Sequence, residues 1–365
     1  MLDRMQRLRR GAVTTVGTAI MVVVLASCGG TGPDNRQNAL HPAGSAARKI
    51  LDLMNPFFWV AVVVGAGVVG MTIFVALRFR ERPGEEDRSP VQTHGNIVLE
   101  VSWTIIPFLI LAVMAVPTVA TIFNLAKIPK GANVVHVNVD ARQWFWQYEY
   151  TDKGTQFFTA NEMHIPVHQP VVLTLTSKNV IHSFWVPELA GKKDVVPGHT
   201  NTLTIEANRT GTFLGQCAEY CGLSHANMRL RVVVQTKAEY DNWIREQQAP
   251  LSTAKAAQFD KLAKPWGCTS CHSITSTKKT VGATIGPNLT HVGDRQAFAG
   301  DIYPMQLDDL TKWIYDAPGR KPAGPLKGWM PAFDKSGMTV SQAQQLAKFL
   351  LCDTATSPSA HPECR

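Results

Sequence analysis

Two features that would point to common protein classes are missing from this 365-residue sequence. No run of lysine and arginine is interleaved with aromatic residues, and the net charge of +8 is mild for the length. Nucleic-acid binding therefore has no support. The sequence also holds no internal repeat and no low-complexity tract, so it has to be interpreted segment by segment. Its length allows two or three domains with buried cores.

Charge is also absent from three long apolar stretches, and the first of them follows a basic start. Residues 11–27 come after MLDRMQRLRR, a pattern typical of a secretory signal. The stretch ends in LASC, which is similar to the processing site of bacterial lipoproteins, where Cys28 would become the lipidated N-terminus. We expect residues 1–27 to be a lipoprotein signal peptide. The alternative is an uncleaved anchor helix with an incidental cysteine.

The other two apolar stretches, residues 57–77 and 101–126, predict two membrane-spanning helices. Each exceeds the roughly 20 apolar residues that cross a bilayer. The loop between them, RFRERPGEEDRSP, carries four arginines, which indicates the cytoplasmic side by the positive-inside rule. The sequence therefore predicts a transmembrane hairpin over residues 56–127 whose loop lies on the cytoplasmic side. Everything after Lys127 is expected outside, on the extracytoplasmic face of a bacterial plasma membrane.

The remaining segments differ from one another in composition. Residues 28–55 are polar and rich in glycine and alanine, which favours a flexible spacer. Residues 131–245 hold short β-rich runs such as VVHVNV and VVLTLT between turns, which is typical of a small sandwich or Greek-key barrel. Residues 255–352 combine loops with short helices, and residues 353–365 form a C-terminal tail.

The densest chemistry lies in QCAEYCGLSHANM, at residues 216–228. Cys217, Cys221, His225 and Met228 offer two thiolates, an imidazole and a thioether from one short loop. A second histidine, His182, occurs upstream in NVIHSFWVPELAG. Soft thiolate and thioether ligands select copper, and imidazole suits it as well. The pattern therefore predicts a copper site.

Two alternatives compete with copper at this loop. Two cysteines and two histidines would also make a closed zinc site, but zinc needs neither a methionine in register nor the apolar HSFWVP setting of the remote histidine. In an exported domain, Cys217 and Cys221 could instead form a disulfide.

The pattern C-x-E-x-C-G-x-x-H-x-x-M, preceded by HSFWVPEL, resembles the dinuclear copper (CuA) site of the cytochrome oxidase subunit II family. The resemblance covers roughly residues 50–245 and implies a cupredoxin-like domain over residues 131–245. It implies that two bridging thiolates, two terminal imidazoles, a weak thioether and a weak backbone carbonyl come from Cys217, Cys221, His182, His225, Met228 and Glu219. By the same resemblance, the Glu219 side chain helps to hold a magnesium ion at the contact with subunit I.

Two further positions match the same family. RQWFWQYEY resembles its aromatic segment, whose first tryptophan, here Trp144, lies on the electron-input route. The alternative for Trp144 is an ordinary strand residue packed in a core. Glu100 in LEVSWTIIP matches the glutamate at the mouth of a proton-uptake channel. Its alternative is an ordinary carboxylate at a helix end.

The motif C-x-x-C-H at residues 268–272 predicts covalent attachment of a c-type haem. Cys268 and Cys271 would form the thioethers, and His272 would be an axial iron ligand. GPNLTHVGDR and WMPAF follow, and residues 255–352 resemble small class I cytochromes c, with Met330 as the sixth ligand. Met305 and Met338 are the competing methionines. The last two cysteines, Cys352 and Cys364, form a plausible disulfide outside the membrane.

Together the segments predict a membrane α-helical hairpin, an all-β cupredoxin-like Greek-key domain and an all-α class I cytochrome c domain. The resemblance implies the electron-input subunit of a terminal respiratory oxidase, without an oxygen-reducing site of its own. Electrons would pass from haem c through the region of Trp144 to CuA, and on to haem a in subunit I. There oxygen would be reduced to water, coupled to proton pumping.

The expected partners are the membrane, oxidase subunits I and III, and a donor that is either cytochrome c or a quinol–cytochrome c reductase complex. Three alternative functions fit the sequence less well. A nitrous oxide reductase-type CuA protein lacks the two-helix hairpin, and a quinol oxidase subunit II has lost the copper ligands. A membrane-tethered copper chaperone or sensor would not need a covalent haem beside the copper.

Overall fold

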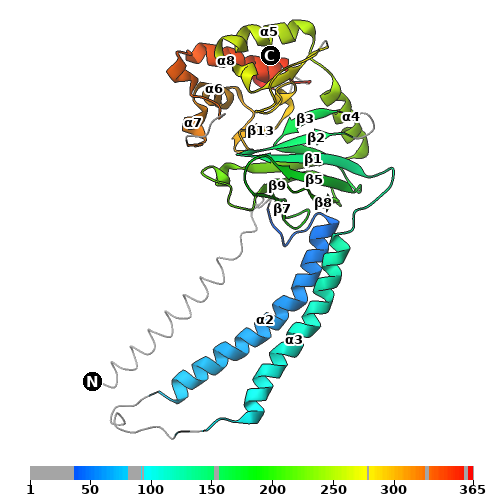
Figure 1. Ribbon diagram of the computed structural model, residues 1–365, viewed down its shortest axis with the longest axis vertical. Coiled ribbons are helices and arrows are strands. Elements are labelled where there is room, and N and C mark those ends of the chain that lie inside the picture. Colours follow the sequence, from blue (N-terminus) through cyan, green and yellow to red (C-terminus); the bar gives the residue numbers. More distant parts are fainter. Residues whose placement is uncertain are drawn as a thin grey trace, which may run out of the picture.

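The computed structural model describes residues 37–80, 92, 94–151, 156–277, 279–324, 329–356 and 361–364. The predicted signal peptide and Cys28 lie outside these residues, as does most of the arginine-rich loop. Figure 1 shows three parts in a row, with a β-sandwich between a helical hairpin and a C-terminal domain.

The hairpin consists of α2 (Ser45–Arg78) and α3 (Ile97–Leu125), which run side by side away from the sandwich (Figure 1). Both helices are long and apolar enough to cross a membrane, and their apolar side chains point outward rather than into the protein. Asn96 caps α3, because its side-chain oxygen accepts hydrogen bonds from the amides of Val98 and Leu99. The predicted hairpin is therefore present.

The start of α2 differs from the prediction of a spacer up to residue 55. The helix begins at Ser45, and the residues before it are attached to the sandwich. The Ala43 amide donates to the carbonyl of Glu188 at 2.7 Å, and the Asn208 amide donates to the carbonyl of Ala43 at 2.7 Å. Ala43 and Ala47 are buried there. These long-range contacts order a segment whose composition alone favours flexibility.

The sandwich contains ten strands in two five-stranded sheets. The first sheet has the order β3 (Phe157–Ala160), β2 (Phe145–Tyr150), β1 (Val135–Arg142), β5 (Val171–Ser177) and β8 (Asn201–Ile205). The second has the order β4 (Glu162–Pro166), β10 (Arg229–Gln235), β9 (Gly211–Cys217), β6 (His182–Trp185) and β7 (Lys193–Val195). One pair in each sheet is parallel, β1 with β5 and β10 with β4.

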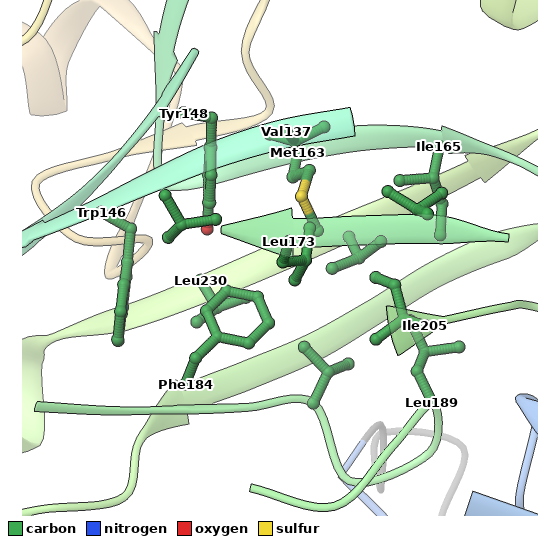
Figure 2. Close-up of a cluster of buried hydrophobic side chains, with 14 of the residues drawn as sticks. Val137, Trp146, Tyr148, Met163, Ile165, Leu173, Phe184, Leu189, Ile205 and Leu230 are labelled. Carbon is green, nitrogen blue, oxygen red and sulfur yellow. The ribbon is translucent and has the colours of Figure 1, made fainter. Parts of the chain in front are cut away.

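The core of the sandwich lies between the two sheets (Figure 2). Val137 and Leu173 enter it from the first sheet, and Met163, Phe184 and Leu230 enter it from the second. All five side chains are fully buried. Complete burial of such a side chain is worth about 1.5–3 kcal/mol. This packing holds the strand ends from which the predicted copper ligands project.

The C-terminal domain is mainly helical and follows the connecting helix α4 (Lys237–Gln248). Its helices are α5 (Thr253–Ala263), α6 (Leu307–Tyr315), α7 (Ala317–Arg320) and α8 (Val340–Lys348). Two short hairpins join them, β11 (Ser273–Thr275) with β12 (Thr280–Gly282), and β13 (Ala297–Phe298) with β14 (Tyr303–Pro304). Cys352 and Cys364 form the expected disulfide. The three-part fold class predicted from the sequence is confirmed.

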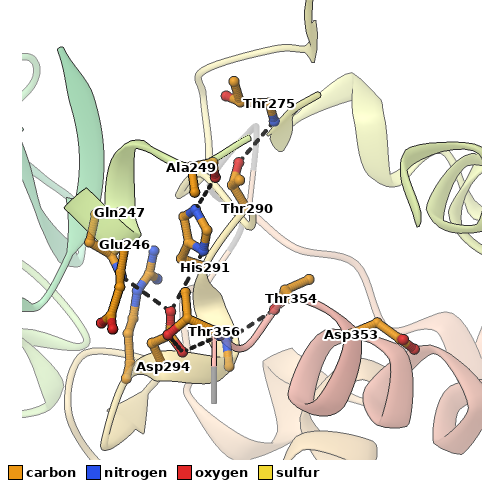
Figure 3. A network of polar contacts seen from close by, with 12 residues as sticks. Glu246, Gln247, Ala249, Thr275, Thr290, His291, Asp294, Asp353, Thr354 and Thr356 are labelled. Carbon is orange, nitrogen blue, oxygen red and sulfur yellow. Dashed lines mark hydrogen bonds and ion pairs between the residues drawn. The ribbon is translucent and has the colours of Figure 1, made fainter. Parts of the chain in front are cut away.

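A polar network fixes the connector to this domain (Figure 3). The ring of His291 donates from Nε2 to the carbonyl of Ala249 at 2.7 Å, and Gln247 donates to Asp294 at 3.2 Å. Asp294 also accepts from the amide of Thr356 at 2.7 Å. The connector therefore meets the C-terminal domain at fixed positions.

Candidate copper and haem sites

The predicted copper loop is held between neighbouring strands of the second sheet. His182 begins β6 and Cys217 ends β9, and these strands pair in antiparallel fashion with Phe184 opposite Cys217. After Cys217 the chain passes through a short 3₁₀ turn, η2 (His225–Asn227), and returns to the sheet at Arg229. Two strand ends and one tight loop therefore supply all the predicted donors.

The structure brings the six predicted copper donors together. The sulfurs of Cys217 and Cys221 lie 3.8 Å apart as free thiols, so the disulfide alternative is not formed. Sγ of Cys217 is 3.9 Å from Nδ1 of His182 and 3.2 Å from the carbonyl oxygen of Glu219. Sγ of Cys221 is 3.5 Å from Nδ1 of His225 and 3.8 Å from the sulfur of Met228.

The surroundings of these donors set the protonation of the two cysteines and of one histidine ring. The hydrogen bond with Cys221 lowers the pKa of Cys217 to about 4 and raises that of Cys221. Nε2 of His182 lies 3.1 Å from the side-chain oxygen of Asn179, which can only accept, so the proton sits on Nε2. The lone pair on Nδ1 then faces the sulfurs, an orientation typical of metal-bound histidine.

Trp144 is attached directly to this site. Its indole Nε1 donates to the carbonyl of Cys221 at 3.0 Å, and the neighbouring Gln143 donates to the same carbonyl at 2.8 Å. The Trp144 side chain is buried, with 1% exposed. Trp144 therefore packs in a core, which was the alternative interpretation of this residue. It also contacts the predicted copper loop.

The predicted haem motif opens the C-terminal domain. Cys268 begins the 3₁₀ turn η4 (Cys268–Ser270), and Gly267 before it has a left-handed conformation with φ 67°. Burial raises the pKa of the Cys268 thiol to about 11. The ring of His272 donates from Nδ1 to the carbonyl of Pro287 at 2.8 Å, which leaves Nε2 free to bind a metal. Burial lowers the pKa of His272 and so favours its neutral form.

A cavity of about 660 Å³ adjoins this motif and reaches the sandwich. Cys268, Cys271, His272 and Met330 line it from the C-terminal domain, and Trp144 lines it from the sandwich. Met305 and Met338, the competitors of Met330, do not line this cavity and are buried in the domain core.

The residues around the cavity fit a haem. Nε of Arg295 and Nε1 of Trp329 are buried without a hydrogen-bond partner among the described residues, and both residues line the cavity. Polar groups of this kind suit an acidic ligand, and haem carries two propionates. Gly286 lies against the ring of His272, since a Cβ at this position would be 2.7 Å from Cε1. A larger residue would displace the proposed iron ligand.

The C-terminal domain is docked on the sandwich beside this cavity. Arg231 of β10 forms an ion pair with Asp301 and donates to Gln296 at 2.8 Å. Arg142 of β1 donates to the carbonyls of Thr284 and of Ile285. The loop at 299–301 reaches the copper loop itself, where the Arg229 amide donates to the carbonyl of Gly300 at 3.0 Å.

Glu100 is the predicted site residue that the structure does not bring near the others. It lies in the first turn of α3, at the end of the hairpin that points away from the sandwich (Figure 1). The side chain of Glu219 accepts from the amide of Tyr220 at 3.2 Å. Among the described residues, only His182, Cys217 and Cys221 form a group of three or more histidine, cysteine or acidic side chains spaced to hold an ion. Magnesium at Glu219 stays a prediction.

Comparisons with known proteins agree with this division into parts. The chain matches the transmembrane domain of cytochrome c oxidase subunit II over residues 33–121, and the periplasmic domain of that subunit over residues 155–236. Residues 256–352 match cytochrome c. Cytochrome c oxidase subunit 2 of Alkalihalophilus pseudofirmus is 35% identical over 306 residues, which cover 82% of this chain and 86% of the relative. The chain belongs to the cytochrome c oxidase subunit II family.

A second relative and a solved structure are also similar to this chain. Cytochrome c oxidase subunit 2 of Bacillus sp. strain PS3 is 33% identical over 348 residues, which cover 91% of this chain and 94% of the relative. The crystal structure of the periplasmic domain of cytochrome oxidase subunit II from Bradyrhizobium japonicum is 31% identical, with a TM-score of 0.31. It covers 33% of this chain and 96% of that domain. Family membership makes the chain a membrane-bound subunit of an oxidase complex, and its domains imply a copper site and a haem.

Proposed function

We propose that this family member receives electrons at a covalently bound haem c and passes them through a CuA centre to haem a in subunit I. The observation that carries the proposal is the shared cavity, which is lined by both the haem motif and Trp144. Trp144 in turn donates a hydrogen bond to the carbonyl of Cys221 in the copper loop. When bound, the haem and the copper pair each take up and release one electron.

The chain's own residues hold the copper in this proposal. The thiolates of Cys217 and Cys221 and the imidazoles of His182 and His225 would hold the copper pair, and Met228 and the carbonyl of Glu219 would be weaker ligands. Asn179 orients the ring of His182, and the strand pairing of β6 with β9 fixes the distance between the remote histidine and the loop. A rigid donor set of this kind changes little between oxidation states, which favours fast electron transfer. A zinc site would leave Met228 without a role.

At the haem, Cys268 and Cys271 would supply the thiols for covalent attachment, and His272 and Met330 would be the two iron ligands. Pro287 fixes the ring of His272 through its carbonyl. Histidine–methionine ligation raises the haem potential. The side chains that line the cavity are mostly apolar, which suits the haem ring.

The proposal also places the chain in its complex. The sandwich and the C-terminal domain lie on the extracytoplasmic side, and subunits I and III are partners in the membrane. Cytochrome c or a quinol–cytochrome c reductase complex is the donor. Glu219 contributes to a magnesium site at subunit I, and Glu100, at the opposite end of the hairpin, belongs to a proton-uptake path used in proton pumping. No oxygen-reducing site is proposed in this chain.

Met330→His tests the serial route, because it replaces the thioether ligand without touching the thioether cysteines. We expect a c-type haem with a lower reduction potential that reduced soluble cytochrome c reduces slowly. Reduction of CuA by this donor should slow in parallel, while a small artificial donor should still reduce CuA. Stopped-flow spectroscopy follows both centres separately.

Met338→Leu is the matched control, because Met338 is a buried core methionine away from the cavity. It should leave the haem spectrum and potential unchanged. If CuA in Met330→His is reduced by cytochrome c as fast as in the wild type, the haem does not feed CuA. Direct access of the donor to CuA would then replace the serial route.

A further inference from the structure

An aromatic contact crosses the boundary between the two extracytoplasmic domains. The ring of Trp329 lies edge-to-face against Trp144, with ring centroids 5.6 Å apart and an interplanar angle of 70°. On its other side Trp329 meets Trp313, at 6.5 Å between centroids. Trp144 continues the series, since its Nε1 donates to the carbonyl of Cys221 at 3.0 Å. The indoles therefore form an unbroken series of contacts between the haem cavity and the copper loop.

Trp329 belongs to the C-terminal domain in sequence but packs against the core of the sandwich. It precedes Met330, the proposed sixth ligand of the haem, and both residues line the shared cavity. Trp329 therefore contacts both the shared cavity and the sandwich that carries the predicted copper loop. Electronic coupling decays steeply with the gap between donor and acceptor, and a filled aromatic contact couples better than a void.

We propose that Trp329 is the bridge for electron transfer between the haem and the copper centre, through the ring of Trp144. The inference rests on the proposed function, in which the haem is the donor to the copper pair. One electron leaves the haem iron and one electron arrives at the copper pair. The indoles stay neutral throughout, and no proton moves and no bond forms or breaks.

Lys321 is the positioning residue for this contact. Its side chain is 1% exposed, and Nζ donates to the carbonyl of Trp144 at 2.7 Å and to the carbonyl of Ala299 at 2.8 Å. The ammonium group also lies 5.8 Å from the centroid of the Trp329 ring. One cation therefore ties the backbone at Trp144 to the C-terminal domain and rests near the bridging ring. Removing it should loosen the ring contact without removing either ring.

A second path exists through the backbone. The Arg229 amide donates to the carbonyl of Gly300 at 3.0 Å, next to the proposed ligand Met228. Gly300 is close-packed here, because a Cβ would lie 2.4 Å from the carbonyl oxygen of Asn227. This path does not involve Trp329, so substitutions of Trp329 separate the two routes.

The experiment uses the whole oxidase complex in detergent. A light flash with a photoreductant places one electron on haem c, and the haem and CuA absorption bands then follow its transfer. Trp329→Leu should slow this step by an order of magnitude or more, and Trp329→Phe, which keeps an aromatic ring, should recover part of the rate. Lys321→Met should also slow it. In the two Trp329 variants, the reduction potentials and spectra of both centres should stay as in the wild type.

Trp243→Phe is the control, since Trp243 lies in the sandwich core on His164, away from the cavity. It should transfer at the wild-type rate. Circular dichroism tests the contact without electron transfer, because Trp329→Leu should abolish the exciton signal of the indole pair and Trp243→Phe should keep it. Wild-type transfer in a fully loaded Trp329→Leu overturns the inference and leaves the step to direct transfer from the haem to Trp144, which lines the same cavity, or to the Gly300–Arg229 path. If the wild type itself shows no transfer from haem to CuA, the proposed function fails instead.

Discussion

The ion pair between Asp301 and Arg231 makes docking of the C-terminal domain on the sandwich dependent on pH. Asp301 has only 4% of its side chain exposed at this interface. Burial raises the pKa of Asp301 to about 6 from its ordinary value of 3.8, because the loss of solvation outweighs the attraction of Arg231. The docked state therefore holds this proton more tightly than an open state in which Asp301 meets water.

The sign and size of the effect follow from these two values. A raised folded-state pKa means that ionisation opposes docking, so docking weakens as the pH rises from 3.8 through about 6 and stays weaker above that. The difference is worth about 3 kcal/mol, or roughly a hundredfold in the opening equilibrium, at about 1.4 kcal/mol per pKa unit. Asp301→Asn should remove this penalty. The left-handed backbone at Asp301, with φ 64°, suits asparagine.

The assay is hydrogen exchange of the Arg229 amide, which donates across the interface to Gly300. At pH 4 wild type and Asp301→Asn should be protected about equally. At pH 7 the variant should be protected up to about a hundredfold more, the factor that corresponds to the pKa difference. Measuring both proteins at the same pH cancels the intrinsic pH dependence of exchange.

Glu162 is a second carboxylate beside Arg231, 3.9 Å from its Nε, so Arg231 keeps an acidic partner in Asp301→Asn. Burial alone would raise the pKa of Glu162, but the hydrogen bond and charge of His164 lower it, so its contribution is lost only as the pH falls below 4.5. Asp308→Asn is the matched control, because Asp308 is exposed and pairs with Lys312 on α6 at 2.6 Å. Equal protection of wild type and Asp301→Asn at pH 7 would mean that Asp301 is hydrated, and the docking geometry would be wrong.

Two other expectations concern the metal and the membrane. Cys217→Ser should abolish copper binding and leave the covalent haem in place, as measured by metal analysis and the haem spectrum. Stoichiometric zinc without copper in the wild-type protein would contradict the assignment. Protease added to intact spheroplasts should cut beyond Lys127 and spare the loop around Arg82, as judged by the fragment masses. Cleavage at Arg82 would reverse the topology.

The parts of the fold that could be predicted depend on local patterns. The runs VVHVNV and VVLTLT lie in β1 and β5, because alternation between a buried and a solvated face is visible within one strand. The six predicted copper donors come from two short segments, so their residue types and spacing are visible in the sequence alone. The haem motif at residues 268–272 is shorter than either of these segments, so it is also visible in the sequence alone. The family resemblance rests on the same local motifs.

The parts that could not be predicted depend on contacts between distant segments. Residues before α2 look like a spacer, and they are ordered only because Glu188 and Asn208 meet their backbone. Asn179 lies three residues before His182, and its role depends on the turn that brings its oxygen to the imidazole. Lys321 looks like a surface lysine in the sequence. Its burial follows from the docking of two domains, which no local pattern encodes.

The polar contacts between the two domains explain why their orientation is specific. A buried cation such as Lys321 and a buried carboxylate such as Asp301 cost free energy unless each finds its partners. Burial lowers the pKa of Lys321 to about 7. Only the observed orientation gives Lys321 the carbonyls of Trp144 and Ala299 and gives Asp301 its arginine. Apolar contacts alone would tolerate a small rotation of one domain against the other. The same rotation would break the hydrogen bonds of Lys321 and the ion pair of Asp301. The same contacts keep Trp329 against Trp144, so that in the proposed route the haem domain would meet the copper domain in every turnover rather than in a fraction of encounters.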